Sequence, residues 1–388
     1  MLELAFVGGK RYWGWICLLV VMIAAGTVCF LWQLDYGLGL TGLSRDVSWG
    51  FYVAQLTFLV GVAASAVMLV LPYYLHNYKV FGKITIVGEF VAVSVITMCM
   101  LFLFVDLGKP LRALNIFLHP TPNSVIFWDG FVLVGYLVLN IIVGWNVLQA
   151  ERNSVPPPMW VKPLIYLSIP WAFAIHTVTA FLYCGLPGRG FWLTAILAPR
   201  FLASAFASGP AFLILLCMLL RKLTMFDPGK EAIQALSKIV TYGLLANLFF
   251  LLCEVFVVFY SKIPGHMNHF IYLYDGLHGK EGLVSWMRAS LVLMVGGMVL
   301  LLIPPARRKE DILAVACIMV FVGTWIDKGM GLISGGFIPS PLHHVFEYVP
   351  TIPELVVSGG VYGIGLLLLT IFLKVVVTVK TERTRGIA

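Results

Sequence analysis

The sequence is poor in charged residues. Of its 388 residues only 11% are Asp, Glu, Lys or Arg, whereas 60% are hydrophobic, and the mean hydropathy is +0.96. A soluble domain is about one quarter charged, so the composition excludes an ordinary soluble protein. The net charge of +8 is better explained by membrane orientation than by nucleic acid, and we expect no nucleic-acid partner.

Motifs for metals, haem and nucleotides are also missing. The seven cysteines lie in or beside apolar runs and form no C-x-x-C pair, which favours packing roles over an iron–sulfur or zinc site. There is no C-x-x-C-H and no Walker A motif. Of the eight histidines only His176 lies well inside an apolar run, which excludes bis-histidine haem within the membrane. We expect no haem, iron–sulfur cluster or metal site in this chain.

Long apolar runs are abundant. Each is long enough to cross a hydrocarbon core of ~30 Å, so we predict an all-α, multi-pass membrane protein forming a single domain over residues 1–388. The predicted spans are 12–34, 49–75, 84–107, 125–148, 161–184, 199–220, 237–261, 283–303, 312–332 and 354–379. We expect a four-helix bundle over 49–184, a second over 199–332, and flanking helices at 12–34 and 354–379.

The basic residues predict the orientation. Of the 26 Lys and Arg, 17 lie on the side of the two termini and nine on the other, which places both termini in the cytoplasm of a cell membrane protein. The longer connections, 108–124, 185–198, 262–282 and 333–353, then lie outside. They are either a docking surface for a partner or ordinary connections.

Polar groups gather in the outer halves of several spans. Trp49, Tyr52 and Gln55 recur at three-residue intervals, close to one helical face. Trp49 and Tyr52 are also typical membrane-surface anchors, whereas Gln55 lies ~9 Å deeper. Asp129 can simply complement a helix dipole, and His176 can simply be hydrogen-bonded inside the bundle. If these spans form one bundle, the polar groups converge on one pocket near the outer surface.

The stretch VDLGKPLR, residues 105–112, follows about twenty apolar residues. It places Asp106, Lys109 and Arg112 at the outer surface, with Pro110 ending the span because proline lacks an amide donor. The charges form either the rim of the pocket, where they can pair with one another and with a partner, or a plain helix stop. Asn123 and Trp128 open the next span on the same side.

Ionisable residues also lie within the second half. Glu254, Arg288, Asp327 and Glu354 fall in outer parts of spans, and Glu89 lies in the inner third of 84–107. Charges in a membrane are costly and tend to pair, so we expect an ion pair between Glu254 and Arg288. These residues form either a proton path or ion pairs that hold helices together. Glu89 is either the inner mouth of that path or a group that reaches the membrane interface.

Several short motifs resemble one family of membrane proteins. They are Trp49-Gly50, DLGKPLR at 106–112, NSVIF at 123–127, HTVTA at 176–180, Glu254 and YVPTIPE at 348–354. The whole chain resembles the NrfD/PsrC-type quinone-interacting membrane subunits, and within them the ten-helix branch that includes DsrP- and HybB-type subunits. HybB-type chains have an acid near the start of the eighth span where this chain has Arg288, so proton-path residues do not transfer directly.

The resemblance implies a division of labour within a respiratory complex of anaerobic or sulfur metabolism. Menaquinone or ubiquinone, with menaquinone preferred, binds near the outer face in the first bundle. A ferredoxin-like iron–sulfur subunit docks there and exchanges electrons with the quinone. Further cytochrome and iron–sulfur subunits belong to such complexes, and proton translocation accompanies the reaction in one interpretation.

These implications assign hypothetical roles to the outer polar residues. His176 and Asp129 exchange protons with the quinone oxygens, Tyr52 and Gln55 orient the head group, and Trp128 packs on its ring. Trp49 and Asn123 complete the quinone site. Two other classes stay open: a secondary transporter, which uses midplane charges and broken helices, and a structural anchor without a quinone site.

Overall fold

The computed structural model describes residues 2–384 and is built from helices, with no β-strand in that range. Ten of its helical segments are long and apolar enough to cross a membrane, so the all-α, multi-pass prediction is confirmed. Helices suit this environment because they satisfy every backbone hydrogen bond within one segment.

The helices follow the predicted spans closely. The long ones are α1 (Lys10–Tyr36), α4 (Thr85–Asp106), α6 (Val125–Arg152), α7 (Val161–Cys184), α8 (Leu197–Leu223), α9 (Lys230–Ser261), α11 (Val284–Leu302) and α15 (Ile352–Thr384). Shorter ones in the connections are η1 (Leu2–Phe6), η2 (Gly37–Leu40), η3 (Lys79–Phe81), η4 (Pro110–Arg112), α5 (Asn115–Leu118), α10 (Pro264–Tyr274) and α12 (Pro304–Arg308).

Two predicted spans are interrupted. The span predicted at 49–75 consists of α2 (Phe51–Ala63) and α3 (Ser65–Leu75), which meet at Ala64. The span predicted at 312–332 begins as α13 (Glu310–Ile326), continues as the π-helical η5 (Asp327–Gly331) and ends as α14 (Leu332–Phe337). Single π-helical turns inside α-helices are frequent at functional sites.

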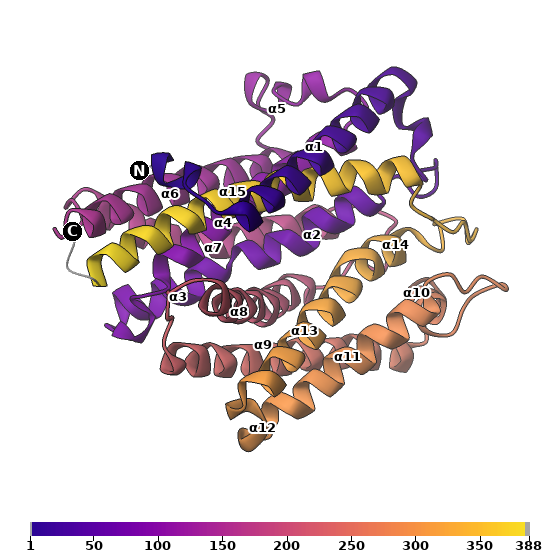
Figure 1. Cartoon of the computed structure of the whole chain (residues 1–388). Helices are drawn as coiled ribbons and strands as arrows, with labels where there is room; N and C mark the ends of the chain where they lie inside the picture. The colour runs from indigo at the N-terminus through magenta and orange to yellow at the C-terminus, as the bar shows by residue number, and fades with distance from the viewer. Residues whose placement is uncertain (1, 385–388) are drawn as a thin grey trace.

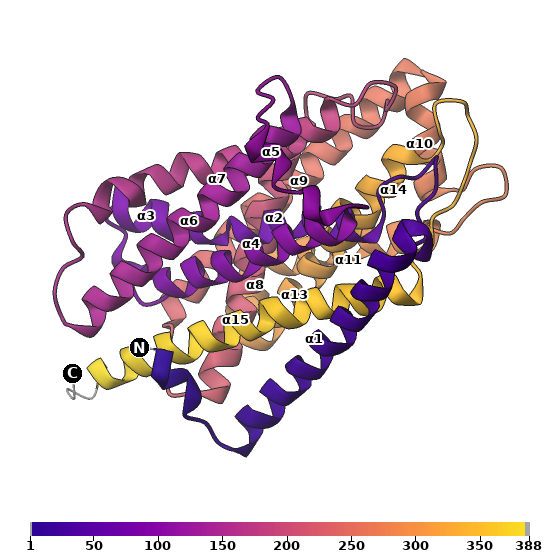
Figure 2. The same ribbon diagram turned by 90° about the horizontal axis from the view of Figure 1, so that it is seen from above.

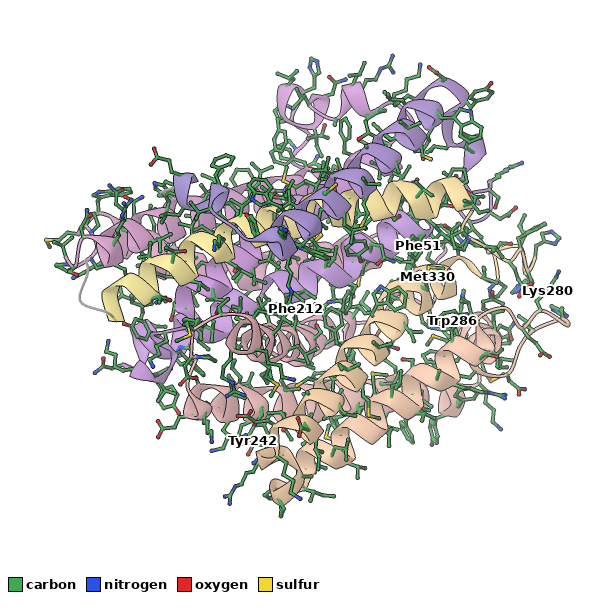
Figure 3. All side chains as sticks on the ribbon, viewed as in Figure 1. Phe51, Phe212, Tyr242, Lys280, Trp286 and Met330 are labelled. Atoms are coloured by element: carbon green, nitrogen blue, oxygen red, sulfur yellow. The ribbon has the colours of Figure 1, made fainter. Side chains whose placement is uncertain are left out.

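The helices pack in an order that follows the chain. In the first half α2 packs on α4, α4 on α6, and α6 on α7; in the second, α8 packs on α9 and α13, and α13 on α11. The two sets meet where α2, α3 and α7 contact α8 and where α2 contacts η5. Figure 3 labels Phe51 and Met330 on these last two elements. Division into two four-helix bundles stays a prediction.

Both chain ends lie at the same end of the molecule, as Figures 1 and 2 show. The connections that follow α10 and α14 extend from the opposite end (Figure 1). An even number of spans requires this arrangement. We call the end with the termini the inner end and the other the outer end, following the predicted orientation.

The segment Phe51–Leu75 is the most enclosed element of the fold. Every residue of its most apolar 18-residue window is buried, whereas in the segment Lys10–Leu40 only 11% of the corresponding window is buried. It therefore presents side chains to neighbours on all sides, and its polar residues must find partners within the protein. The candidate site follows from the directions in which they point.

Candidate functional site

The polar residues of α2 point in opposite directions. The side-chain carbonyl of Gln55 accepts hydrogen bonds from Trp325 Nε1 of α13, at 2.8 Å, and from the Tyr362 hydroxyl of α15, at 2.6 Å. Two residues later, the Thr57 hydroxyl is hydrogen-bonded to that of Tyr183 in α7. Two residues correspond to about 200° around a helix, so Gln55 points away from α7.

This arrangement corrects the prediction of one pocket. Tyr52 and Gln55 were expected to converge with Asp129 and His176, but they face α1, α13 and α15 instead. Asp129 and His176 lie on the side of α7. The prediction considered only the spans from 49 to 184, whereas α15 also packs on α2 and α4.

An outer polar cluster, defined as Gln33, Tyr52, Gln55 and Asp106, lies where α1 and α4 end and α2 begins. The Tyr52 hydroxyl donates to Gln33 Oε1 at 2.8 Å, and Gln33 Nε2 donates to the Val105 carbonyl at 2.8 Å. Gln55 Nε2 and Asp106 Oδ1 are buried without a hydrogen-bond partner in the described chain. The cluster therefore holds one free donor and one free acceptor.

Glu354 lies beside this cluster and is saturated with hydrogen bonds. Its carboxylate accepts from the Gly42 amide at 2.9 Å, the Thr351 amide at 3.2 Å and the Tyr348 hydroxyl. Burial and the Glu354 charge raise the pKa of Tyr348, so the phenol stays protonated and keeps donating. The Phe51 amide donates to the same hydroxyl at 2.8 Å. These contacts favour the structural role for Glu354.

Asp129 of α6 and His176 of α7 are both buried, and no hydrogen bond joins them within the described chain. The Thr179 hydroxyl donates to Asp129 Oδ1 at 2.6 Å, and His176 Nδ1 is 2.9 Å from the Ala172 carbonyl. That carbonyl can only accept, so Nδ1 carries the proton. Nε2 is buried without a hydrogen-bond partner within the described residues.

Trp128 and Asn123 lie at the protein surface. Trp128 is 43% exposed and donates from Nε1 to the Pro122 carbonyl at 2.8 Å, and Asn123 is exposed. The structure therefore does not bring them to the outer polar cluster. Trp49 lies closer to the interior, where its ring packs against Tyr183, Trp192 and Phe337 with centroids 5.7 to 6.0 Å apart.

The charges of the DLGKPLR stretch do not pair with one another. Lys109 and Arg112 are exposed, and no ion pair joins either to Asp106 among residues 2–384. α4 ends at Asp106, and Leu107 is already extended, so the helix stops three residues before η4 begins at Pro110. The two basic side chains remain available to a partner.

A buried charge cluster, defined as Arg200, Glu254, Asp327 and Lys328, joins α8, α9 and η5. Arg200 bonds Glu254 at 2.5 Å and both oxygens of Asp327 at 2.8 and 2.9 Å. The Lys328 ammonium lies 3.4 Å from the Phe201 carbonyl and 4.2 Å from the centre of its ring. All four charged residues are buried.

The predicted ion pair between Glu254 and Arg288 is therefore wrong. Arg288 is exposed on α11, where its guanidinium lies 3.6 Å from Asp275 and donates to the Tyr274 carbonyl. Arg200 falls at the start of the span predicted at 199–220, and α8, which begins at Leu197, carries it into the interior. Two carboxylates buried in one region of the membrane require a buried cation, because their charges are otherwise too costly. This requirement could have identified Arg200 from the sequence.

The outer polar cluster fits a quinone head group in its chemistry. A quinone carbonyl accepts hydrogen bonds, and Gln55 Nε2 is free to donate one. A quinol hydroxyl donates hydrogen bonds, and Asp106 Oδ1 is free to accept one. Tyr52, three residues before Gln55 on α2, donates to Gln33 of α1, which donates to the carbonyl of Val105, next to Asp106 in α4. In contrast, no group of three His, Cys, Asp or Glu side chains in the described range could hold a metal ion.

Known proteins of similar sequence are membrane subunits. A Halobacterium salinarum protein named as a membrane subunit of a dimethyl sulfoxide reductase is 25% identical, over 92% of this chain and 89% of its own. The integral membrane subunit of an Hdr-like menaquinol oxidoreductase from Archaeoglobus fulgidus is 25% identical, over 61% and 59%. That of menaquinone reductase from Nitratidesulfovibrio vulgaris is 21% identical, over 93% and 90%.

A family model gives the same result over most of the sequence. The model described as polysulphide reductase, NrfD matches residues 39–340. This range contains α2 through α14 and thus most of the polar residues described above. The chain is a multi-pass membrane protein and belongs to the polysulphide reductase NrfD family.

Proposed function

We propose that this chain is the quinone-interacting membrane subunit of a multi-subunit redox complex. It exchanges electrons between menaquinol or menaquinone and a ferredoxin-like iron–sulfur subunit docked on the outer face. Two relatives named for menaquinol or menaquinone support the quinone. The proposal rests on two buried polar atoms of the outer polar cluster that have no hydrogen-bond partner in the described chain, the Gln55 Nε2 donor and the Asp106 Oδ1 acceptor.

The bound quinone supplies the two-electron chemistry, and the chain supplies positions and proton partners. Gln55 donates from Nε2, because its carbonyl is already fixed by Trp325 and Tyr362. Asp106 accepts the hydroxyl proton at Oδ1. Tyr52, whose hydroxyl donates to Gln33, helps to hold α2 against α1 at this site.

His176 and Asp129 are proposed to carry protons next to this site rather than to touch the quinone. His176 Nε2 is buried without a hydrogen-bond partner among the described residues, and the Asp129 carboxylate holds one hydrogen bond. Tyr183 of α7 is hydrogen-bonded to Thr57 of α2. This bond joins α7 to the helix that carries Tyr52 and Gln55.

The partner is proposed to bind at the outer end. Lys109 and Arg112 are exposed there, close in sequence to Asp106, and their charge suits an acidic surface of an iron–sulfur subunit. Further cytochrome and iron–sulfur subunits, a role in anaerobic sulfur metabolism and a DsrP-type identity follow from the resemblance and remain proposals.

The test measures electron transfer from a menaquinol analogue in the assembled complex. Gln55→Leu and Asp106→Asn are each expected to lower the rate about tenfold or more, since an unpaired buried polar partner costs ~1–3 kcal/mol. Asn146→Leu is the matched control, because that amide only donates to Ile142 within its own helix. Unchanged rates in Gln55→Leu, Asp106→Asn and His176→Gln together would remove this site from the mechanism.

One observation favours a secondary transporter as the second candidate. The buried charge cluster lies at a π-helical interruption of a spanning segment, and transporters bind ions at broken helices. Solute flux by the lone chain in liposomes would support transport. Bound quinone extracted from the purified complex would support the redox function and count against a purely structural anchor.

A further inference from the structure

A cavity of about 390 Å³ lies at the inner end, between α3, α4 and α6. Its wall includes Tyr73 and Tyr74 of α3, Thr85 of α4 and Glu151 of α6. Lys380 of α15 lies beside it, with its ammonium 2.9 Å from a Glu151 oxygen. The volume is sufficient for several water molecules, and the polar wall suits them.

Glu89 is not part of the cavity wall but lies deeper on α4 than the wall residue Thr85. It follows Thr85 by four residues on α4 and so shares its helical face, one turn deeper. Helical side chains lean toward the helix N-terminus, which directs the Glu89 carboxyl back toward Thr85 and the cavity. Gly144 of α6 leaves room for it, since a Cβ at that position would lie 3.3 Å from Glu89 Oε2.

Glu89 differs from the other buried acids of the membrane region. Glu254 and Asp327 are paired with Arg200, and Glu354 accepts hydrogen bonds from three donors. Both Glu89 oxygens are buried and lack a hydrogen-bond partner in the described chain. An unpaired carboxylate is costly in an apolar interior, whereas the neutral acid is tolerated, so a proton is the ligand that this site requires.

We propose that the cavity and Glu89 form a proton-exchange site that opens to the inner end of the molecule. A proton passes between cavity water and the Glu89 carboxyl group, which alternates between its neutral and charged forms. The titratable groups that face Glu89 are Tyr74 of α3, Tyr136 and Glu151 of α6, and Lys380 of α15. Glu89 lies seventeen residues, or ~25 Å of helix, from Asp106, so this site does not depend on the proposed quinone site.

The first test uses dicyclohexylcarbodiimide, an apolar reagent that modifies protonated carboxyl groups, on the full-length protein in its native membrane. Peptide mass spectrometry is expected to find the adduct on Glu89 at a level about tenfold above Glu254, because an ion pair keeps a carboxyl charged. Glu89→Gln should abolish that adduct. An unmodified Glu89, or equal modification of Glu254, would overturn the proposal.

The second test follows the carboxyl proton itself. The infrared carbonyl band that disappears in Glu89→Gln should shift rapidly when native protein is moved into D₂O. Ala150→Leu, which fills the cavity wall, is expected to slow this shift about tenfold, since exchange then requires a local opening. An equally fast shift would show that protons reach Glu89 by another route.

A sided measurement avoids dependence on a variant. A water-soluble carbodiimide is added to sealed vesicles from one side at a time, using native protein only. Modification of Glu89 is expected from the side that bears the chain termini. Modification from the opposite side alone would contradict a cavity that opens to the inner end.

Discussion

Arg200 binds two carboxylates at once. Its guanidinium contacts Glu254 with one nitrogen and both oxygens of Asp327 with another. The planar fork of arginine suits this geometry, whereas lysine offers one compact charge. Since all three side chains are buried, each partner depends on the others for its charge to be tolerated.

Arg200→Met should therefore strongly destabilise the protein. Removing one partner from a buried ionic network costs about 3–5 kcal/mol, because the two carboxylates remain without a cation. Thermal unfolding in detergent measures this loss. Arg288→Met is the control, since the Arg288 side chain is 62% exposed and should change stability by less than about 0.5 kcal/mol. Equal losses in both variants would contradict the assigned network.

His269 of α10 gives a prediction about pH. Its Nδ1 lies 2.6 Å from the Gly335 carbonyl and 3.0 Å from that of Ile338, and burial lowers its pKa. The unfolded chain therefore binds a proton at higher pH than the folded one does. Stability should be full above about pH 6.5 and fall as pH drops below that value.

Melting temperatures measured across this pH range test the assignment. His269→Gln removes the titrating group, so it should flatten the acid side of the curve. His278→Gln is the matched control, because His278 is exposed in the following connection and should keep the wild-type slope. An unchanged slope in His269→Gln would show that other groups cause the acid loss.

At the scale of helices, α1 depends on one close crossing. A Cβ at Gly26 would lie 2.5 Å from the Cα of Gly360 in α15, so the two backbones touch. Small residues permit such approach between membrane helices. α1 packs mainly on α15 and the adjoining η2, so this crossing holds it to the rest of the protein.

Gly360→Leu should separate the two helices. Inserting a large side chain into a packed contact costs about 1–3 kcal/mol, which thermal unfolding would detect as a lower melting temperature. The neighbouring Gly359 has nothing within 4 Å of its Cβ position, so Gly359→Leu should be nearly neutral. A matching loss in both variants would place the effect in the helix itself rather than in the crossing.

The whole molecule makes a prediction about topology. Lys280 lies at the outer end, away from both termini, as labelled in Figure 3. A cysteine at Lys280→Cys should react with a membrane-impermeant maleimide from outside intact cells, and a C-terminal fluorescent fusion should emit from the cytoplasm. A cysteine at Arg308→Cys, in the inner connection α12, is the matched control and should stay unlabelled. The reverse pattern would invert the orientation.

The spans were predictable because apolar length is a local property of the sequence. The span predicted at 161–184 matches α7, and the family resemblance is confirmed by the match over residues 39–340. The directions of polar side chains were not predictable. Gln55 bonds Trp325 and Tyr362, partners about 270 to 307 residues away in the chain, and no local pattern identifies them.

The buried charges were also predicted only in part. The sequence identified Glu254 and Asp327 as buried acids but paired Glu254 with the wrong arginine. The depth of a residue in the membrane does not show in which direction around the helix axis its side chain points. The π-helical turn at Asp327–Gly331 also carries no apolar signature. Such turns are fixed by packing against neighbours, here α2 and α13.

The buried charge cluster has a consequence for the response to membrane voltage. When Arg200, Lys328, Glu254 and Asp327 are all ionised, their charges sum to zero, and the membrane potential exerts no net force on them as a rigid unit. One added or removed proton would leave the cluster with a net charge of one. Moving one such charge across the whole membrane changes its energy by about 2.3 kcal/mol per 100 mV. The cluster would then respond to voltage only while its protonation differs from the balanced state.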